Sequence, residues 1–272
     1  MRSTVVTRRT RVFASPEFEE APVHDDLGRD FEPFTPQRVV SLVPSITEAV
    51  ASVDARLLVG ATDYCTHPAD LSVRRVGGSK YPDVAAVLAC GPDLVLANAE
   101  ENRRVDVEAV EAAGVPVWVC YPTTVLEALA SASRMFTDAL QVPEPAWVER
   151  ARRVWAEPAP MIGTAVIPIW RKPWMVLGGA TFAGDVLQRL GVHNVFASSD
   201  ESYPTMNVER ILAAQPDLVV LPDEPYRFTV DDGPSFFAPT PARLVNGRYL
   251  TWHGPSLAEA RDVLAEQLST DL

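Results

Sequence analysis

The sequence has little cysteine, no long apolar run and fewer basic than acidic residues, and each shortage excludes a class of protein. Its three cysteines form no CxxC pair, so neither a disulfide framework nor a structural zinc site is indicated, and a reducing compartment fits best. No stretch reaches the roughly 18 apolar residues of a membrane span. The net charge of -12 opposes binding to nucleic acid and to anionic membranes.

The first residues also lack a secretory signal. Such a signal needs an uninterrupted apolar run of roughly 7 to 15 residues after its positive region. Here Val5 and Val6 are soon followed by Arg8 and Arg9, and no cysteine stands where a lipoprotein anchor would be placed. As written, the chain is expected in the cytoplasm; a mis-assigned start site that hides a signal peptide would make it extracytoplasmic.

The familiar motifs of catalysis and nucleotide binding are absent as well. There is no GxGxxG after a strand pattern, no GxxxxGK(S/T), no GxSxG and no HExxH. Their absence removes the usual support for dinucleotide, P-loop, hydrolase and zincin functions. We therefore assign no catalytic residue and no required cofactor, and we expect a binding protein rather than an enzyme.

What is present is the profile of an ordered globular protein, with 47% hydrophobic and 22% charged residues. Residues 1–36 mix charges and prolines without an apolar period, which is typical of an arm lying over the surface or of a mobile tail. From residue 38 onward, apolar runs alternate with helical patterns, which predicts an α/β fold with parallel strands. In the first half, strands are expected at Val39–Val43, Leu57–Thr62, Leu94–Ala97 and Val115–Cys120, and helices at Ile46–Val53, Val84–Ala89 and Val105–Ala113.

A sequence motif that occurs twice, called the echo, divides the chain into two halves. Tyr81-Pro82, followed by Pro92-Asp93-Leu94-Val95, returns as Tyr203-Pro204, followed by Pro216-Asp217-Leu218-Val219, and the Pro-Asp pairs are 124 positions apart. This spacing far exceeds the periods of solenoid repeats. We interpret the echo as two related, Rossmann-like α/β lobes; the alternative is that Pro-Asp-Leu-Val is simply a common helix-to-strand turn.

Two helical patterns connect the halves, at 123–140 and at 146 to about 157, and neither contains an interior proline or glycine. They predict a rigid connection, with a ligand cleft between the carboxyl ends of the two sheets. The expected organisation is an arm at 1–36, a first lobe at 37–121, a helical connection at 122–158 and a second lobe at 160–272.

One candidate anion site lies at the start of the first helix. Ser45-Ile46-Thr47-Glu48 has the S-x-x-E spacing of a capping box directly after the first expected strand. A helix beginning at Ser45 would present unpaired backbone N–H groups at the mouth of the cleft, where they could hold an acidic group of a ligand. The alternative is a simple helix cap.

Histidines and aromatic residues in loops are the other candidate contacts. His67 shares a loop with Asp63, Tyr64 and Cys65, a composition suited to metal ligation but equally to a plain turn. Aromatic side chains in such loops can stack on a flat ligand or pack one lobe against the other. The aromatic candidates in the second half are Trp170, Trp174, Tyr203, Tyr226 and Trp252, which His253 follows.

Several runs of residues resemble a known family. They are Arg38–Glu48, Leu58–Cys65 with His67-Pro68, Val76–Gly78, Gly91–Leu96, Thr181-Phe182 and Gly191–Phe196. Together they are similar to the cobalamin-binding members of the class III periplasmic binding proteins, also called helical-backbone metal receptors. This superfamily includes siderophore and haem receptors, and the resemblance covers about residues 37–265.

The resemblance implies two lobes joined by a rigid backbone helix, with a flat metal chelate held between them and little hinge motion. By position, Tyr64 matches a residue that packs against the corrinoid. The matching second-lobe loop comprises Thr251, Trp252, His253, Gly254 and Pro255. We expect a planar ligand between Tyr64 on one side and Trp252 with Trp174 on the other, with His67 or His253 as the axial ligand of its metal.

Three features depart from the family pattern. The chain has no export signal, and its connecting helix is confined between Pro145 and Pro158, a span of roughly 20 Å at 1.5 Å per residue. Members that serve an importer offer one surface carboxylate per lobe to the permease. Glu209 matches the second-lobe position, but Ala85 occupies the first. We therefore do not expect docking to an ABC permease of the usual kind.

Three functions remain open at this stage. The leading hypothesis is a non-enzymatic protein that binds a corrinoid or a similar tetrapyrrole or siderophore-like chelate. The second is a bare metal ion held by His67, His253 and nearby carboxylates. The third is a cytosolic enzyme that processes a chelate, such as a chelatase, with a cleft histidine or Glu101 as its base.

Overall fold

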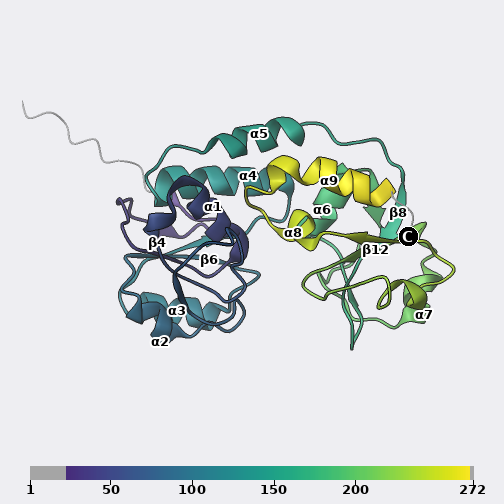
Figure 1. Cartoon of the computed structure of the whole chain (residues 1–272), viewed down its shortest axis with the longest axis horizontal. Coiled ribbons are helices and arrows are strands. Elements are labelled where there is room, and N and C mark those ends of the chain that lie inside the picture. Colours follow the sequence, from purple (N-terminus) through teal and green to yellow (C-terminus); the bar gives the residue numbers. More distant parts are fainter. Residues whose placement is uncertain (1–22, 270–272) are drawn as a thin grey trace, which may run out of the picture.

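The computed structural model describes residues 23–269, which form two α/β lobes side by side (Figure 1). The first lobe has a five-stranded parallel sheet in the order β5-β4-β3-β6-β7. Its strands are β3 (Val39–Ser41), β4 (Leu58–Ala61), β5 (Arg74–Arg75), β6 (Leu94–Asn98) and β7 (Val117–Cys120). Its helices are α1 (Pro44–Asp54), η1 (Ala55–Leu57), α2 (Val84–Ala89) and α3 (Arg104–Ala112).

The second lobe has a four-stranded parallel sheet in the order β11-β8-β12-β13. Its strands are β8 (Gly163–Val166), β11 (Val192–Asn194), β12 (Leu218–Pro222) and β13 (Ala242–Val245), and β9 (Pro168–Trp170) with β10 (Met175–Val176) forms an antiparallel hairpin. Its helices are α6 (Phe182–Arg189), α7 (Val208–Ala213), η3 (Pro234–Phe236), α8 (Gly247–Thr251) and α9 (Leu257–Ser269). The expected α/β fold with two lobes is confirmed.

The echoed turns have the same structural role in both lobes. Asp93 precedes β6 and accepts hydrogen bonds from the backbone N–H groups of Gln37 and Arg38, just before β3, at 2.8 and 2.9 Å. Asp217 precedes β12 and accepts one from the backbone of Thr164 in β8 at 2.8 Å. In each lobe, a carboxylate therefore ties the start of one strand to the start of its parallel neighbour. This shared function explains why the Pro-Asp turn occurs twice.

The connection between the lobes is a pair of helices rather than one backbone helix. Helix α4 (Val125–Arg134) continues into the π-helical turn η2 (Met135–Ala139), and α5 (Ala146–Val154) then packs against α4. Figure 1 shows α4 and α5 running along one side of the two lobes, with α9 close to α5. The second connecting helix was expected to end at about Glu157, but α5 ends at Val154.

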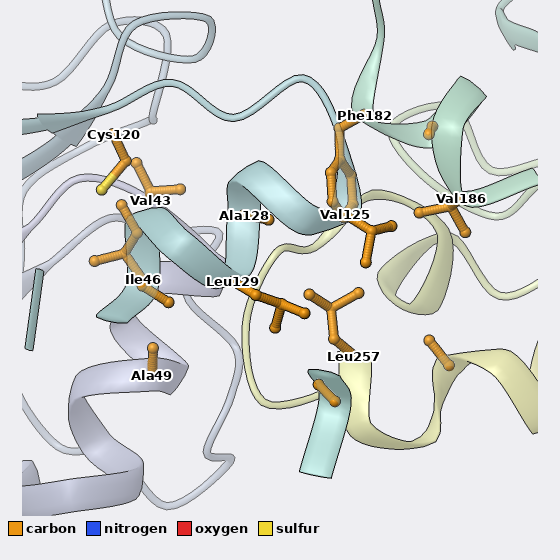
Figure 2. Close-up of a cluster of buried hydrophobic side chains, with 14 of the residues drawn as sticks. Val43, Ile46, Ala49, Cys120, Val125, Ala128, Leu129, Phe182, Val186 and Leu257 are labelled. Atoms are coloured by element: carbon orange, nitrogen blue, oxygen red, sulfur yellow. The ribbon is translucent and has the colours of Figure 1, made fainter. Parts of the chain in front are cut away.

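One hydrophobic cluster, the shared core, runs through both lobes and the connection, and each lobe has a second cluster of its own. The shared core includes Ile46 of α1, Leu129 of α4, and Phe182 and Leu257 of the second lobe. In Figure 2, Leu129 lies between Ile46 on one side and Leu257 on the other. Because separating the lobes would expose this apolar surface to water, the shared core opposes hinge motion.

The part of the arm that the structure describes lies over the edge of the first lobe. Residues 23–36 include the hairpin of β1 (Val23–His24) and β2 (Asp30–Phe31). Between these strands, the backbone N–H of Asp26 donates to the carbonyl of Val119 in β7 at 3.1 Å. The rest of the predicted arm, residues 1–22, lies outside the described residues, as do residues 270–272. No helix within 23–269 is long and apolar enough to cross a membrane.

Candidate functional site at the lobe boundary

The capping box predicted at Ser45 is wrong, because helix α1 begins one residue earlier. Pro44 is the first helical residue, and Val43 precedes the helix without any side-chain cap. Proline suits this position, since the N–H group that it lacks would have no partner within the helix. Ser45 is only 2% exposed, and its hydroxyl oxygen is buried without a hydrogen-bond partner. It lies under the second lobe rather than at an open mouth.

Glu48, the other half of that motif, instead pairs with the second lobe. Its carboxylate accepts a hydrogen bond from Arg248 of α8, and both side chains are largely shielded from solvent. The guanidinium of Arg248 also lies over the ring of Trp252, with 5.6 Å between the guanidinium carbon and the ring centroid. This ion pair therefore joins α1 of the first lobe to α8 of the second.

The loop 251–255 packs directly on the first lobe. Trp252 is 8% exposed, and its ring meets that of His67 edge to face, with 5.4 Å between centroids. Gly254 approaches Ser45 so closely that a Cβ at Gly254 would lie 2.7 Å from the Ser45 carbonyl oxygen. Trp252 thus packs one lobe against the other, and little of its ring is left for a ligand to stack on.

His253 also spans the boundary. Its Nε2 lies 3.3 Å from the amide nitrogen of Asn98, which ends β6, and its ring packs edge to face on Phe182. Burial lowers the pKa of His253 to about 4, so the imidazole is neutral at pH 7. His67 has its Nδ1 3.1 Å from the hydroxyl of Thr66. Within residues 23–269, no group of three histidine, cysteine or acidic side chains could hold a metal ion, so the bare-metal hypothesis gains no support.

The other aromatic candidates of the second lobe pack mainly within it. Trp174 stacks parallel on Phe228, with 6.0 Å between centroids, and also contacts Phe237. Trp170 is 43% exposed and meets Tyr226, whose hydroxyl donates to Asp232 at 2.6 Å. The structure thus brings Trp170, Trp174 and Tyr226 into one cluster in the second lobe.

Carboxylates that follow the two echoed strands meet at the boundary. Glu100 and Glu101 follow β6, and Glu224 follows β12; we call these three residues the interlobe carboxylates. Tyr203 of the second lobe donates a hydrogen bond from its hydroxyl to Glu100 of the first. The negative charge of Glu224 acts on Glu101 from the other lobe. Because the carboxyl ends of parallel strands are where α/β folds bind ligands, this is the candidate site.

The sequence analysis predicted only some of the residues at this site. It named Tyr203 as an aromatic contact and Glu101 as the base of a hypothetical enzyme, but it missed Glu100, Glu224 and Arg248. The echo itself contained the signal, since Glu100-Glu101 follows one echoed strand and Asp223-Glu224 follows the other. Extending the repeat by six residues past its last match would have found both acidic pairs.

Among the interlobe carboxylates, Glu101 has the largest shift in pKa. Burial, followed by the charges of Glu100 and Glu224, raises its pKa to about 7, and Lys80 opposes the shift. Burial and the charge of Asp223 likewise raise the pKa of Glu224, against the lowering effects of Trp252 and Arg248. A protonated Glu101 adds no negative charge, so this site becomes more anionic as the pH rises through neutrality.

We expect Glu101→Gln to remove a pH-dependent loss of stability. The pKa of Glu101 is raised in the folded state, so the folded chain binds more protons between about pH 4.5 and 7, and the free energy of unfolding falls as the pH rises through that range. At pH 8 the variant should be more stable by roughly 1–3 kcal/mol, since one pKa unit corresponds to about 1.36 kcal/mol. Urea unfolding at pH 5, 6, 7 and 8 measures the difference.

The exposed Glu259→Gln on α9 is the control for this titration and should follow the wild-type pH profile. His253 has a lowered pKa and contributes the opposite slope, but it is present in all three proteins and cancels in the comparison. Parallel pH profiles for wild type and Glu101→Gln would show that Glu101 titrates normally.

A hollow of about 430 Å³ lies away from the lobe boundary, between the arm and the first lobe. Its lining includes Arg29, Phe31 and Glu111. The guanidinium of Arg29 already pairs with Asp25 and with Glu111, each at 2.7 Å. Since the one basic side chain of its lining is already paired, we do not assign this hollow to the ligand.

The two predicted docking positions occupy equivalent places in the lobes. Ala85 lies on α2 and Glu209 on α7, both are exposed, and they are 124 positions apart, the same offset as the echo. Figure 1 shows α2 and α7 on the side of the molecule away from α5. A carboxylate is present in this pair only at Glu209.

Comparison with known proteins defines the class. No family model matches the chain. Its fold is nevertheless that of the class III periplasmic binding proteins, with two lobes that superpose on solved members of that class. The family resemblance seen in the sequence is therefore confirmed.

Three relatives show the range of the superfamily that the chain resembles. It is 26% identical over 247 residues to the vitamin B12-binding protein of Yersinia pseudotuberculosis serotype O:3 (strain YPIII), covering 86% of this chain and 87% of that protein. The apo periplasmic heme-binding protein RhuT from Roseiflexus sp. RS-1 superposes with a TM-score of 0.72 at 20% identity, covering 85% and 97% of the two chains. The periplasmic vitamin B12-binding protein BtuF of Vibrio cholerae gives 0.66 at 19%, covering 87% and 98%. All three are named as binding proteins, in agreement with the expectation of a non-enzyme.

Proposed function

We propose that the chain is a substrate-binding protein that holds a flat metal chelate, a corrinoid such as cobalamin or a related tetrapyrrole, between its two lobes. The observation that carries the proposal is the similarity to vitamin B12-binding relatives over 86% of the chain, which includes both lobes and the connection between them. Binding between the lobes would involve the carboxyl edges of both sheets at once.

The shared core supports this proposal. A large planar molecule binds well in a site whose walls are already in place, because little conformational entropy is then lost on binding. The joint between the lobes is held by the core, by the pair of Glu48 with Arg248, and by the packing of Gly254 on Ser45. These contacts favour a preformed site over one that closes by hinge motion.

Exposed tyrosines at the first lobe's carboxyl edge supply a stacking surface. Tyr64 follows β4 and is 66% exposed, and the absence of a side chain at Gly78 lets its ring edge approach the backbone. Tyr121 follows β7 and is also exposed; it lies near enough to Tyr203 to influence its pKa. Two exposed rings at this edge of the sheet offer apolar contact to a flat ligand.

Delivery to a membrane permease is not part of the proposal. Only one of the two equivalent docking positions carries a carboxylate, Glu209, and the expected cytoplasmic location stays a prediction. A soluble binding, storage or delivery role for the chelate agrees with these features.

Titration of the protein with cobalamin, cobinamide and haem tests the proposed function. We expect at least one of them to bind with a dissociation constant below about 10 μM, which corresponds to a binding free energy of roughly 7 kcal/mol. Absorbance of the chelate and quenching of tryptophan fluorescence report the binding. Tyr64→Ala should weaken it by about tenfold, since an aromatic contact contributes roughly 0.5–1.5 kcal/mol beyond area burial.

The control for this titration is Tyr249→Phe, a variant that removes only the hydroxyl of a partly buried tyrosine on α8 and should bind like wild type. Native mass spectrometry of protein purified from its own host would identify any ligand that stays bound. Failure of all three chelates to bind more tightly than about millimolar would exclude the proposed function.

A further inference from the structure

Two of the interlobe carboxylates, Glu100 and Glu224, are 124 positions apart, the offset of the echo, so negative charge is built into both walls of the proposed site. Glu100 and Glu101 follow β6, and Glu224 follows β12, the two strands of the echo. The Tyr203 hydroxyl of the second lobe donates to Glu100 of the first, and the charge of Glu224 raises the pKa of Glu101, so carboxylates of both lobes lie near the boundary. The inference developed below rests on the proposed function, because it takes this region as the ligand site.

The positive charges near this region are fewer and are already engaged. Lys80 donates to the backbone carbonyl of Glu100 at 3.1 Å, and Arg248 pairs with Glu48. Asp223 adds a further carboxylate, which accepts a hydrogen bond from the backbone of Gly247 at 2.6 Å. His253 adds no charge at pH 7, because burial lowers its pKa to about 4. The region is therefore anionic overall.

One of the carboxylates in this region has an oxygen without a hydrogen-bond donor. One carboxylate oxygen of Glu224, Oε1, is buried without any partner. The side chain of Glu101 is half-buried and strongly desolvated. Leaving a buried acceptor unsatisfied costs roughly 1–3 kcal/mol, and more for a charged group. A ligand donor that reaches Glu224 Oε1 would recover that cost.

We propose that this site selects flat chelates whose periphery carries hydrogen-bond donors or positive charge, and that it discriminates against chelates bearing carboxylates. The amide groups around a corrinoid can donate to Glu101 and Glu224. The propionates of a porphyrin such as haem would instead meet like charge in a partly desolvated region. The carboxylates thus determine specificity, while the aromatic contacts determine that the ligand is flat.

The experiment compares two ligands that differ only in this chemistry: cobalt(III) protoporphyrin IX with free propionates, and its bis-amide. Both are titrated against the full chain at pH 8 and low ionic strength, where Glu101 is ionised and charge screening is weak. The bis-amide should bind at least tenfold more tightly to wild type. In Glu101→Gln/Glu224→Gln the preference should fall below threefold, because both carboxylates become neutral amides.

The matched control is Glu149→Gln/Glu259→Gln, which removes the same two charges from exposed positions on α5 and α9 and should keep the tenfold preference. Unfolding midpoints of all three proteins establish that they are folded. The comparison of the two ligands on wild type needs no variant, so it holds even if the double variant is unstable. Equal binding of the two ligands, or tighter binding of the propionate form, would overturn the inference and leave the proposed function standing. Binding of neither ligand, nor of cobalamin or cobinamide, would overturn both.

Discussion

Trp252→Ala is expected to lower the free energy of unfolding by roughly 3–5 kcal/mol, the range for removing a buried tryptophan. The side chain is 8% exposed and is packed between His67 of the first lobe and Arg248 of the second. Truncation leaves a cavity where the lobes meet, so it weakens the fold and the joint together. Urea or thermal unfolding followed by circular dichroism measures the loss, which should reduce the Tm by about 10 °C.

Trp170→Ala is the matched control, because the same residue type is 43% exposed on the β9–β10 hairpin. It should cost less than about 1 kcal/mol, as surface substitutions usually do. Similar losses in the two variants would mean that Trp252 is not part of the joint. If Trp252→Ala instead kept its stability and lost only chelate binding, the stacking role first expected from the sequence would be restored.

Gly254→Ala is expected to destabilise the protein by roughly 1–3 kcal/mol, the usual cost of overpacking. A Cβ at Gly254 would lie 2.7 Å from the carbonyl oxygen of Ser45, closer than atoms in contact can approach. The obstacle is backbone of helix α1, which cannot swing aside as a side chain can. The loop 251–255 and α1 must therefore separate, which should also speed amide hydrogen exchange in α1.

Gly78→Ala provides the comparison within the first lobe. Its Cβ would meet only the ring edge of the exposed Tyr64, at 3.3 Å, and that side chain can move. This variant should stay within about 0.5 kcal/mol of wild type. If Gly254→Ala were equally mild, the lobes would be able to shift apart at little cost, and the preformed site of the proposed function would lose its basis.

The shared core connects stability to function in this protein. The joint is made of apolar contacts through α1, α4 and α9, supplemented by polar contacts that cross from one lobe to the other. Because the same residues hold the fold and set the distance between the lobes, a change in the joint should alter both chelate affinity and unfolding. Glu101 and Glu224 are different, since their replacement should change which chelate binds while stability is kept or increased.

Local patterns in the sequence predicted the elements well, because short-range physics sets them. Helix α2 has the expected bounds Val84–Ala89, because Asp83 caps it and Gly91 follows it with a positive φ. Thr181 was expected to cap the next helix, and its hydroxyl does accept a hydrogen bond from Gly184. The capping box predicted at Ser45 was wrong, because the helix begins one residue earlier, at Pro44. Proline at the first helical position is itself a local signal, and the S-x-x-E spacing led us to overlook it.

The sequence by itself determined the fold class and the two-lobe repeat. Alternation of strands and helices requires parallel sheets, and a repeated Asp turn joins the same pair of strands in each lobe. Only the tertiary structure decided which side chains face one another across the boundary. Glu48 and Arg248 are 200 positions apart, and Asn98 and His253 are 155 apart, so no local pattern could link them. Their partnership depends on how the shared core sets one lobe against the other, and that same packing turned Trp252 into a contact of the joint and brought acidic side chains of both lobes together.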